Sequence, residues 1–222
     1  MLNITTPYPY KEFKRKSVGG KRLYENPYGE PVPSVTTILS KTKDMTHLNA
    51  WKKRVGEKKA QEIVTEAASV GTVMHEILEA WSLNKEYTGK NMLQAKMMAE
   101  TVIKNVEADI DEVWGSEVNL CYPGLYAGTT DLVGIYKGRP TIMDFKQTNR
   151  PKKREWIQDY LMQLTAYAAA HNAIFNTEID QGVVLMCSRD LTFQRFELMG
   201  EKFTRATDAF MKKLDLYNET LI

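Results

Sequence analysis

The stretch "LYAGTTDLVGIYKGRPTIMDFK", residues 125–146, decides the fold. Apolar residues alternate with a period of two on both sides of "KGRP", which predicts two antiparallel strands joined by a tight turn. Residues two apart on a strand share a face, so Ile142, Asp144 and Lys146 point to the same side. An acid and a lysine therefore stand where a buried strand would carry apolar side chains.

The predicted turn also brings a second acid to the first. If the turn is centred near Lys137 and Gly138, the antiparallel register sets Asp131 opposite Asp144, and directly opposed residues lie ~4.5–5.5 Å apart at Cα. Two carboxylates this close repel unless a cation compensates them, and hard cations such as Mg²⁺ or Mn²⁺ prefer oxygen ligands. An ammonium group at Lys146 would orient a water molecule there. A structural acid-lysine pair is the alternative, which the second acid disfavours.

A further candidate ligand lies on the predicted helix "GTVMHEILEAW". Gly71, His75 and Glu79 are spaced by four, so they share one helix face. Imidazole is a common metal ligand, and the two acids need a third. A lone histidine on an apolar helix face is more often a core residue, and this alternative stays open.

The remaining patterns predict an α/β chain with a mixed sheet. Apolar residues alternate in strands after about residue 113, while helical spacing dominates before it. We expect a single domain, 1–222, with a helical region at about 34–110 and a sheet with helices at about 113–220. The predicted elements are a helix starting near Ser34, two helices within 47–83 separated at Gly71, a helix at 91–110, strands around 117–146, a helix at 153–175, a hairpin around Arg189 and Asp190, and a helix at 201–217.

Composition excludes several classes of protein. The chain has 222 residues, of which 43% are hydrophobic and 26% charged, and it lacks the ~18 continuous apolar residues of a membrane span. Cys121 and Cys187 are far apart, so neither a disulfide framework nor a thiolate metal cage is expected. The N-terminus shows no signal or transit pattern, so we expect a cytoplasmic protein without membrane contact.

Four motifs in this order resemble the PD-(D/E)XK nuclease superfamily, in its RecB-like exonuclease branch: "GTVMHEILE", "GTTDLVGIY", "DFKQT" and "QLTAY". The "PSVTTIL" segment, followed by a basic helix that contains tryptophan, is similar to the family of mitochondrial genome maintenance exonucleases and their phage relatives. The resemblance implies a PD-(D/E)XK restriction-endonuclease-like core, with a central mixed β-sheet flanked by helices and an N-terminal helical region. It also favours a phage or bacterial setting, since no mitochondrial transit segment is recognisable.

The resemblance implies roles for individual residues. His75, Asp131 and Asp144 would bind the catalytic metal with the carbonyl of Phe145, and Lys146 would serve the attacking water. Glu117 matches a family acid only with an offset, and a surface role is equally open. The threonine of "DFKQT" lies one position later than in the family's pattern.

We expect further residues to contact DNA. Gln163 and Tyr167 share a helix face and would line the active cleft, where aromatic rings can stack on bases. Trp156 and Tyr160 lie on the same stripe, and their role is open. Basic residues and hydroxyls would contact phosphates without reading sequence. The remaining candidates are Thr148, Arg150, Lys152, Lys153, Arg154, Lys52, Lys53, Ser34 and Thr36, although Ser34 and Thr36 are equally explained by helix capping.

Together these features predict a Mg²⁺- or Mn²⁺-dependent DNA exonuclease that prefers single-stranded ends and has little sequence specificity. A structure-specific endonuclease on the same fold is one alternative. A non-catalytic nucleic-acid-binding module of a replication or recombination assembly is another. We expect a monomer that acts on DNA in replication, recombination or repair, with proteins of those processes as candidate partners.

Overall fold

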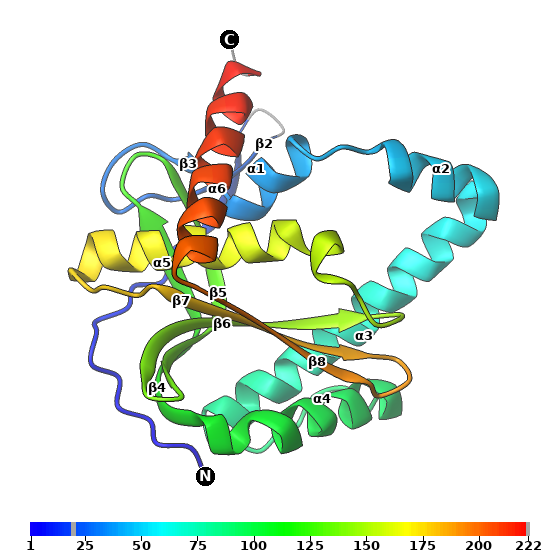
Figure 1. The fold of residues 1–222 in the computed structure, drawn as a ribbon, viewed down its shortest axis with the longest axis horizontal. Coiled ribbons are helices and arrows are strands. Elements are labelled where there is room, and N and C mark those ends of the chain that lie inside the picture. Colours follow the sequence, from blue (N-terminus) through cyan, green and yellow to red (C-terminus); the bar gives the residue numbers. More distant parts are fainter. Residues whose placement is uncertain (19–20, 221–222) are drawn as a thin grey trace.

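The computed structural model describes residues 1–18 and 21–220, which include a five-stranded mixed sheet at the centre (Figure 1). Its strands lie side by side in the order β4-β5-β6-β7-β8. Strands β6 and β7 are parallel, and the other neighbours are antiparallel, so the expected mixed sheet is confirmed. The strands are β4 (Ile110–Tyr122), β5 (Tyr126–Tyr136), β6 (Arg139–Thr148), β7 (Gln181–Ser188) and β8 (Phe193–Met199).

The β5–β6 turn has the predicted position. Lys137 and Gly138 both have positive φ, 49° and 77°, as the two central residues of a type I′ hairpin turn require. The strand pairing runs from Tyr136 opposite Arg139 to Leu132 opposite Met143. One further step in this register places Asp131 across from Asp144, as the sequence predicted.

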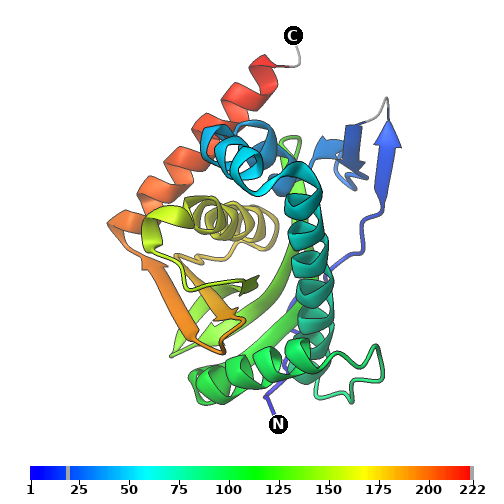
Figure 2. The ribbon, with the colours of Figure 1, turned by 90° about the vertical axis from the view of Figure 1, so that its right-hand side faces the viewer.

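Helices cover both faces of the sheet (Figures 1 and 2). Helices α5 and α6 pack on one face, and the second half of α3 packs with α4 on the other. A small sheet near the N-terminus lies beside β5. The helices are α1 (Val35–Lys41), α2 (Thr46–Val55), α3 (Glu57–Ser82), α4 (Leu93–Val106), α5 (Gln158–Phe175) and α6 (Glu201–Glu219). Short 3-10 turns are Glu107–Asp109 and Arg154–Trp156, and the small sheet contains β1 (Arg15–Val18), β2 (Lys21–Tyr24) and β3 (Val32–Pro33).

Alternation along β6 divides the core into two layers. Ile142 packs in the cluster that includes α5 and α6, whereas Met143 and Phe145 pack in the cluster that includes α3 and α4. Burying a side chain of this size stabilises the fold by ~1.5–3 kcal/mol. These contacts fix the register of β6, because a slip of one residue would turn Asp144 and Lys146 into the α3–α4 layer.

The predicted helix break at Gly71 is wrong. The break lies at Gly56, which has a φ of 88° and separates α2 from α3, and α3 continues through Gly71 for a total of 26 residues. A Cβ atom at Gly71 would lie 3.9 Å from the Cβ atom of Gln147 on β6. Gly71 therefore marks the place where α3 crosses close to β6, and the small helix penalty of a glycine, ~1 kcal/mol, is tolerated there.

The N-terminal segment lies across the end of α5. Tyr8 and Tyr10 pack against His171 and Phe175, with the Tyr8 and His171 ring centroids 4.9 Å apart. Ile4 forms a β-bridge to Val113 on β4, so the N-terminal segment is also attached to the edge strand of the sheet. No helix in the described part of the chain is long and apolar enough to cross a lipid bilayer.

Candidate metal centre

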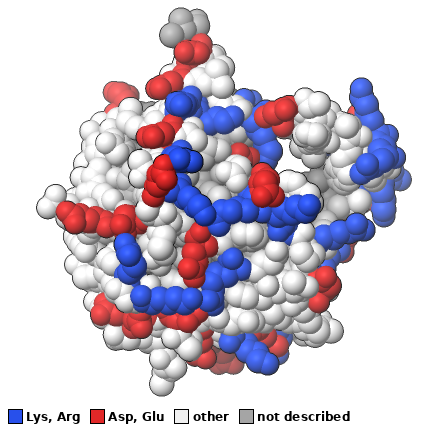
Figure 3. All heavy atoms as spheres, viewed as in Figure 1, with Lys and Arg blue, Asp and Glu red and all other residues white. Residues whose placement is uncertain are grey.

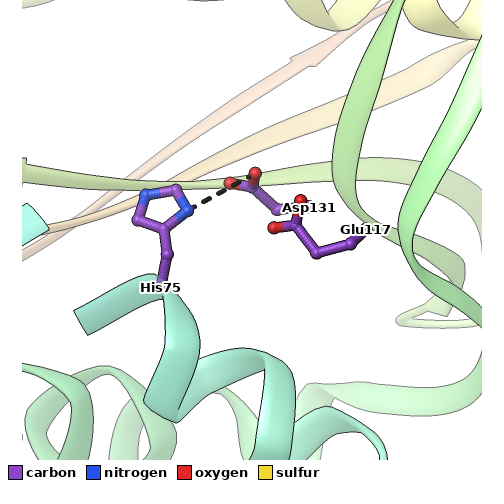
Figure 4. A group of neighbouring side chains, drawn as sticks. All are labelled: His75, Glu117 and Asp131. Carbon is purple, nitrogen blue, oxygen red and sulfur yellow. Dashed lines mark ion pairs between the residues drawn. The ribbon is translucent and has the colours of Figure 1, made fainter. Parts of the chain in front are cut away.

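The side chains of His75, Glu117 and Asp131 point toward one another (Figure 4). His75 projects from α3, Asp131 from β5 and Glu117 from β4, and one ligand atom of each lies within 4.8 Å of the others. The Nδ1 atom of His75 is 3.5 Å from Oδ1 of Asp131. Two neighbouring strands and a helix from another part of the sequence thus present two carboxylates and an imidazole to one point.

Glu117 reaches this point because of the local geometry of β4. The pairs that flank it, Ser116 with Leu132 and Val118 with Thr130, place Glu117 across from Asp131. Glu117 has a φ of 50°, a left-handed conformation that is uncommon for a residue other than glycine and that often marks a functional site. The structure therefore places Glu117 in this group, and its match to a family acid stays a prediction.

The donor set fits a divalent cation. A cation bound at ~2.0–2.6 Å from each ligand keeps its ligand atoms within ~5 Å of one another, as they are here. Two carboxylates with one imidazole suit Mg²⁺ or Mn²⁺ and leave coordination positions for water. Burial and the negative charge of Asp131 together raise the pKa of Glu117 to about 7. A cation would reverse this effect.

Asp131 is held on both sides of its carboxylate. Its Oδ2 atom accepts a hydrogen bond of 2.6 Å from the backbone N–H of Phe145, while Oδ1 faces His75. Burial opposes the charged form of Asp131, but the neighbouring His75 and Lys146 outweigh it and lower the pKa of this carboxyl. Asp131 is therefore ionised and oriented. Phe145 contributes its N–H group to this arrangement, and its predicted role as a carbonyl ligand stays a prediction.

Asp144 pairs with Lys146. The Lys146 ammonium contacts Oδ2 of Asp144, whose side chain is only 1% exposed. Gln163 donates to the other carboxylate oxygen of Asp144 over 3.4 Å and has its amide nitrogen 3.2 Å from the hydroxyl of Tyr167. Asp144, which the sequence predicted as a metal ligand, is not among the three residues whose ligand atoms converge, and its carboxylate contacts Lys146 and Gln163 instead. Its role as a metal ligand therefore stays a prediction.

The electrostatics of this pair follow from its burial. Burial raises the pKa of Asp144, and Lys146 only partly opposes the shift. Burial lowers the pKa of Lys146, but Asp144 and Asp131 outweigh it and raise the pKa overall. Lys146 therefore holds its proton firmly and acts as a charged hydrogen-bond donor. Its Nζ atom also lies 5.1 Å from the ring centroid of Tyr160, a residue whose role the sequence left open.

His75, Glu117, Asp131 and Lys146 line a cleft of about 700 Å³, which we call the central cleft, whereas Asp144 is buried and does not line it. The walls come from α1, α3, β4, β5, β6, α5 and the small N-terminal sheet. Its lining residues include His75, Glu117, Asp131, Lys146, Gln147, Gln163, Tyr167, Tyr24, Thr36, Gly71 and Gly128. A Cβ atom at Gly128 would meet the ring of Tyr167 at 2.6 Å, so this glycine makes room for the aromatic wall.

The predicted hydroxyl contacts divide into two groups. Thr36 lines the central cleft. Ser34 is buried and caps α1, because its Oγ atom accepts a hydrogen bond of 3.0 Å from the N–H of Thr37. Thr148 is also buried and donates to the carbonyl of Arg150, so its hydroxyl is committed within the chain.

The predicted basic contacts lie outside the central cleft. The backbone of Lys152 bonds to Gln194, and the guanidinium of Arg154 donates to the carbonyl of Glu197, so this segment is anchored to β8. Arg150 and Lys153 are exposed, and Lys153 lies 5.7 Å from the ring centroid of Trp156.

Lys52 and Lys53 are exposed on α2. Figure 3 shows Lys and Arg side chains gathered at the right, over α2.

The chain is similar in sequence to mitochondrial genome maintenance exonuclease 1. Its identity is 27% to the protein of Xenopus tropicalis over 172 residues, which are 72% of this chain and 49% of that protein. Identity to the protein of Homo sapiens is 26% over 210 residues, covering 85% of this chain and 58% of that protein. The chain thus spans about half the length of the curated relatives it matches. This similarity confirms the resemblance that the motifs indicated.

Two other comparisons complete this result. No protein-family model matches the chain. Among solved structures, a candidate exonuclease from Eubacterium rectale aligns with a TM-score of 0.46 and 8% identity, covering 69% of each chain.

Proposed function

We propose that the chain is a divalent-metal-dependent DNA exonuclease that hydrolyses phosphodiester bonds and prefers single-stranded ends. The observation that carries the proposal is the convergence of His75, Glu117 and Asp131 in one cleft with Lys146, which pairs with the buried Asp144. The sequence similarity to mitochondrial genome maintenance exonuclease 1 supports the same reaction class.

His75, Glu117 and Asp131 would hold Mg²⁺ or Mn²⁺. When bound, the cation supplies Lewis-acid stabilisation of charge on the phosphoryl oxygens and favours deprotonation of the attacking water. The hydrogen bond from the Phe145 N–H keeps one oxygen of Asp131 engaged and aims the other at the site. Preorganised ligands of this kind need no rearrangement during the reaction.

Lys146 contributes a fixed positive charge at the edge of the central cleft. Its ammonium group has three donors, of which Asp144 uses one, so the others are available to a phosphate oxygen or to the attacking water. Gln163 holds Asp144 from the α5 side, and Tyr167 adjoins Gln163. We assign Asp144 and Gln163 to positioning Lys146.

The size of the central cleft supports a single-stranded substrate. A cleft of about 700 Å³ matches a small-molecule site, which suits one or two nucleotides rather than a duplex. Tyr24 and Tyr167 line this cleft but are only 5% and 2% exposed, so their rings pack within the chain and do not offer a face for base stacking. The predicted phosphate contacts read no bases. Little sequence specificity is therefore part of the proposal.

Digestion of end-labelled single strands tests the proposal. We expect degradation with Mg²⁺ or Mn²⁺, none in chelator, and a loss of ~10²-fold or more for Lys146→Ala and for Asp144→Ala. Lys137→Ala is the matched control, since Lys137 is a lysine of the same hairpin that lies at the turn and pairs with Glu197. Undiminished digestion by both site variants would refute the assigned centre.

Two further arms separate the alternatives. A closed circular single strand is spared by an exonuclease and cut by an endonuclease. Labels at the 5′ and 3′ ends, run in parallel, give the polarity. DNA binding that persists in chelator without turnover in any divalent metal would indicate a non-catalytic binding module.

A further inference from the structure

A second hollow lies between α5 and α6, away from the central cleft. It has a volume of about 430 Å³, and we call it the α5–α6 groove. No residue lines both hollows within the described ranges. The groove is lined by Arg154, Gln158, Leu161, Met162, Leu198, Lys202, Arg205, Ala206, Ala209 and Lys213.

The floor of the α5–α6 groove is apolar. Leu161 and Met162 of α5 meet Leu198 of β8 there. Ala206 and Ala209 of α6 lie one turn apart, and their small side chains leave space between the two helices. A methyl or methylene group entering this space would gain ~0.8 kcal/mol for each group removed from water.

The rim of the groove is positively charged, and most of this charge has no paired carboxylate. Arg154 and Lys213 donate to backbone carbonyls, those of Glu197 and Thr42, which carry no net charge. Lys202 is exposed and forms no ion pair within the described residues, whereas Arg205 pairs with Glu201. The lining itself contains no acidic side chain. Figure 3 shows blue side chains across the middle of the face that carries α5 and α6.

We propose that the α5–α6 groove docks an acidic peptide segment of a partner protein, with carboxylates at the rim and an apolar side chain on the floor. Charge complementarity selects the carboxylates, and the apolar floor selects the adjoining side chain. A nucleic acid strand fits the groove less well, because no aromatic ring lines it for base stacking. The groove does not include Gln163 or Tyr167, which line the central cleft from α5. A docked partner and a DNA end can therefore bind at the same time.

Fluorescence anisotropy tests this docking site. The probe is a fluorescein-labelled peptide in which a run of aspartates is followed by two leucines. One control peptide replaces the aspartates with asparagines, and another replaces the leucines with serines. The full chain is titrated into each peptide at low and at physiological salt, because exposed charges are screened over ~8–10 Å.

Lys202→Glu and Lys212→Glu form a matched pair of variants. Both change one exposed lysine of α6 to an acid, but only Lys202 lines the groove. We expect saturable binding of the first peptide, loss of binding for both control peptides, and about tenfold weaker binding by Lys202→Glu than by Lys212→Glu. Both variants should keep the thermal unfolding midpoint and the DNA digestion of the parent chain, because neither residue lies in the core or the central cleft.

Three results would overturn the docking site. The first is the absence of saturable binding of the aspartate-leucine peptide. The second is an equal effect of the two lysine variants, which would indicate general attraction to a basic surface. The third is displacement of the peptide by a single-stranded oligonucleotide whose own binding is weakened by Lys202→Glu but not by Lys212→Glu. The groove would then belong to the path of the DNA.

Discussion

A buried histidine on α5 should make the stability of the fold depend on pH. His171 is 0% exposed, with the Tyr10 hydroxyl 3.0 Å from its Nε2 atom and the Thr177 hydroxyl 2.7 Å from Nδ1. Burial lowers the pKa of His171 to about 4. The perturbation is a change of pH from 7.5 to 5.0, with His171→Gln as the variant that removes the titrating group.

The sign and size of the effect follow from linkage. A free histidine has a pKa of ~6.5, so between pH 6.5 and pH 4 the unfolded chain binds a proton that the folded chain excludes. The contribution of neutral His171 to the free energy of unfolding is fully present above pH 6.5 and is lost as the pH falls from 6.5 to 4. At pH 5.0 the loss relative to pH 7.5 amounts to about 2 kcal/mol in the free energy of unfolding.

Urea denaturation at the two pH values measures this difference. Glu117 and Asp144 have raised pKa values, so their protonation makes the fold more stable as the pH falls and opposes the effect of His171. The pH dependence of the parent chain must therefore be compared with that of the variant. We expect the parent chain to lose about 2 kcal/mol more than His171→Gln does between pH 7.5 and pH 5.0. His47→Gln, which removes an exposed histidine of α2, should behave as the parent. Equal pH dependence of the parent and His171→Gln would refute the reasoning.

Three other substitutions test the site and its support. Lys146→Met should lower the rate of DNA digestion by ~10²–10⁴-fold while Mn²⁺ binding is retained, and a normal rate would remove Lys146 from the mechanism. Gly128→Ala should displace Tyr167, because the new Cβ atom would lie 2.6 Å from that ring. We expect the rate of digestion to fall at least about tenfold while circular dichroism shows a folded chain, and an unchanged rate would count against Tyr167 as a cleft wall. Gly134→Ala should destabilise the chain by about 3 kcal/mol in urea, because its Cβ atom would lie 2.0 Å from the carbonyl of Glu112, and a change below 1 kcal/mol would contradict the β4–β5 packing.

The sequence predicted the parts of the site that depend on short-range patterns. The β5–β6 register followed from a two-residue turn at Lys137 and Gly138, and side-chain alternation then placed Asp144 and Lys146 on the α5 side. The apolar stripe of α5 was equally readable, since Leu161 and Leu164 are buried as helical spacing requires. Local geometry decides these features, so one sequence is sufficient.

Features that depend on long-range packing were missed or left open. The position of Glu117 depends on register shifts near the start of β4, which have no sequence signal comparable with a turn. The break at Gly71 was wrong because helix α3 tolerates a glycine where it crosses β6. Arg154 was expected to contact DNA phosphates, but contact with the Glu197 carbonyl draws it toward β8. The positive φ of Glu117, the neighbours of Gly71 and the hydrogen bond of Arg154 reveal these arrangements, and all three are properties of the folded chain.

A calorimetric titration with Mn²⁺ tests the central claim most directly. The parent chain, Asp131→Asn and Asp180→Asn are compared, where Asp180 is an exposed acid that pairs with Arg139 on the surface. The account predicts Mn²⁺ binding by the parent and by Asp180→Asn, and at least about tenfold weaker binding by Asp131→Asn. Equal Mn²⁺ affinity in all three proteins would show that the carboxylate of Asp131 does not hold the metal.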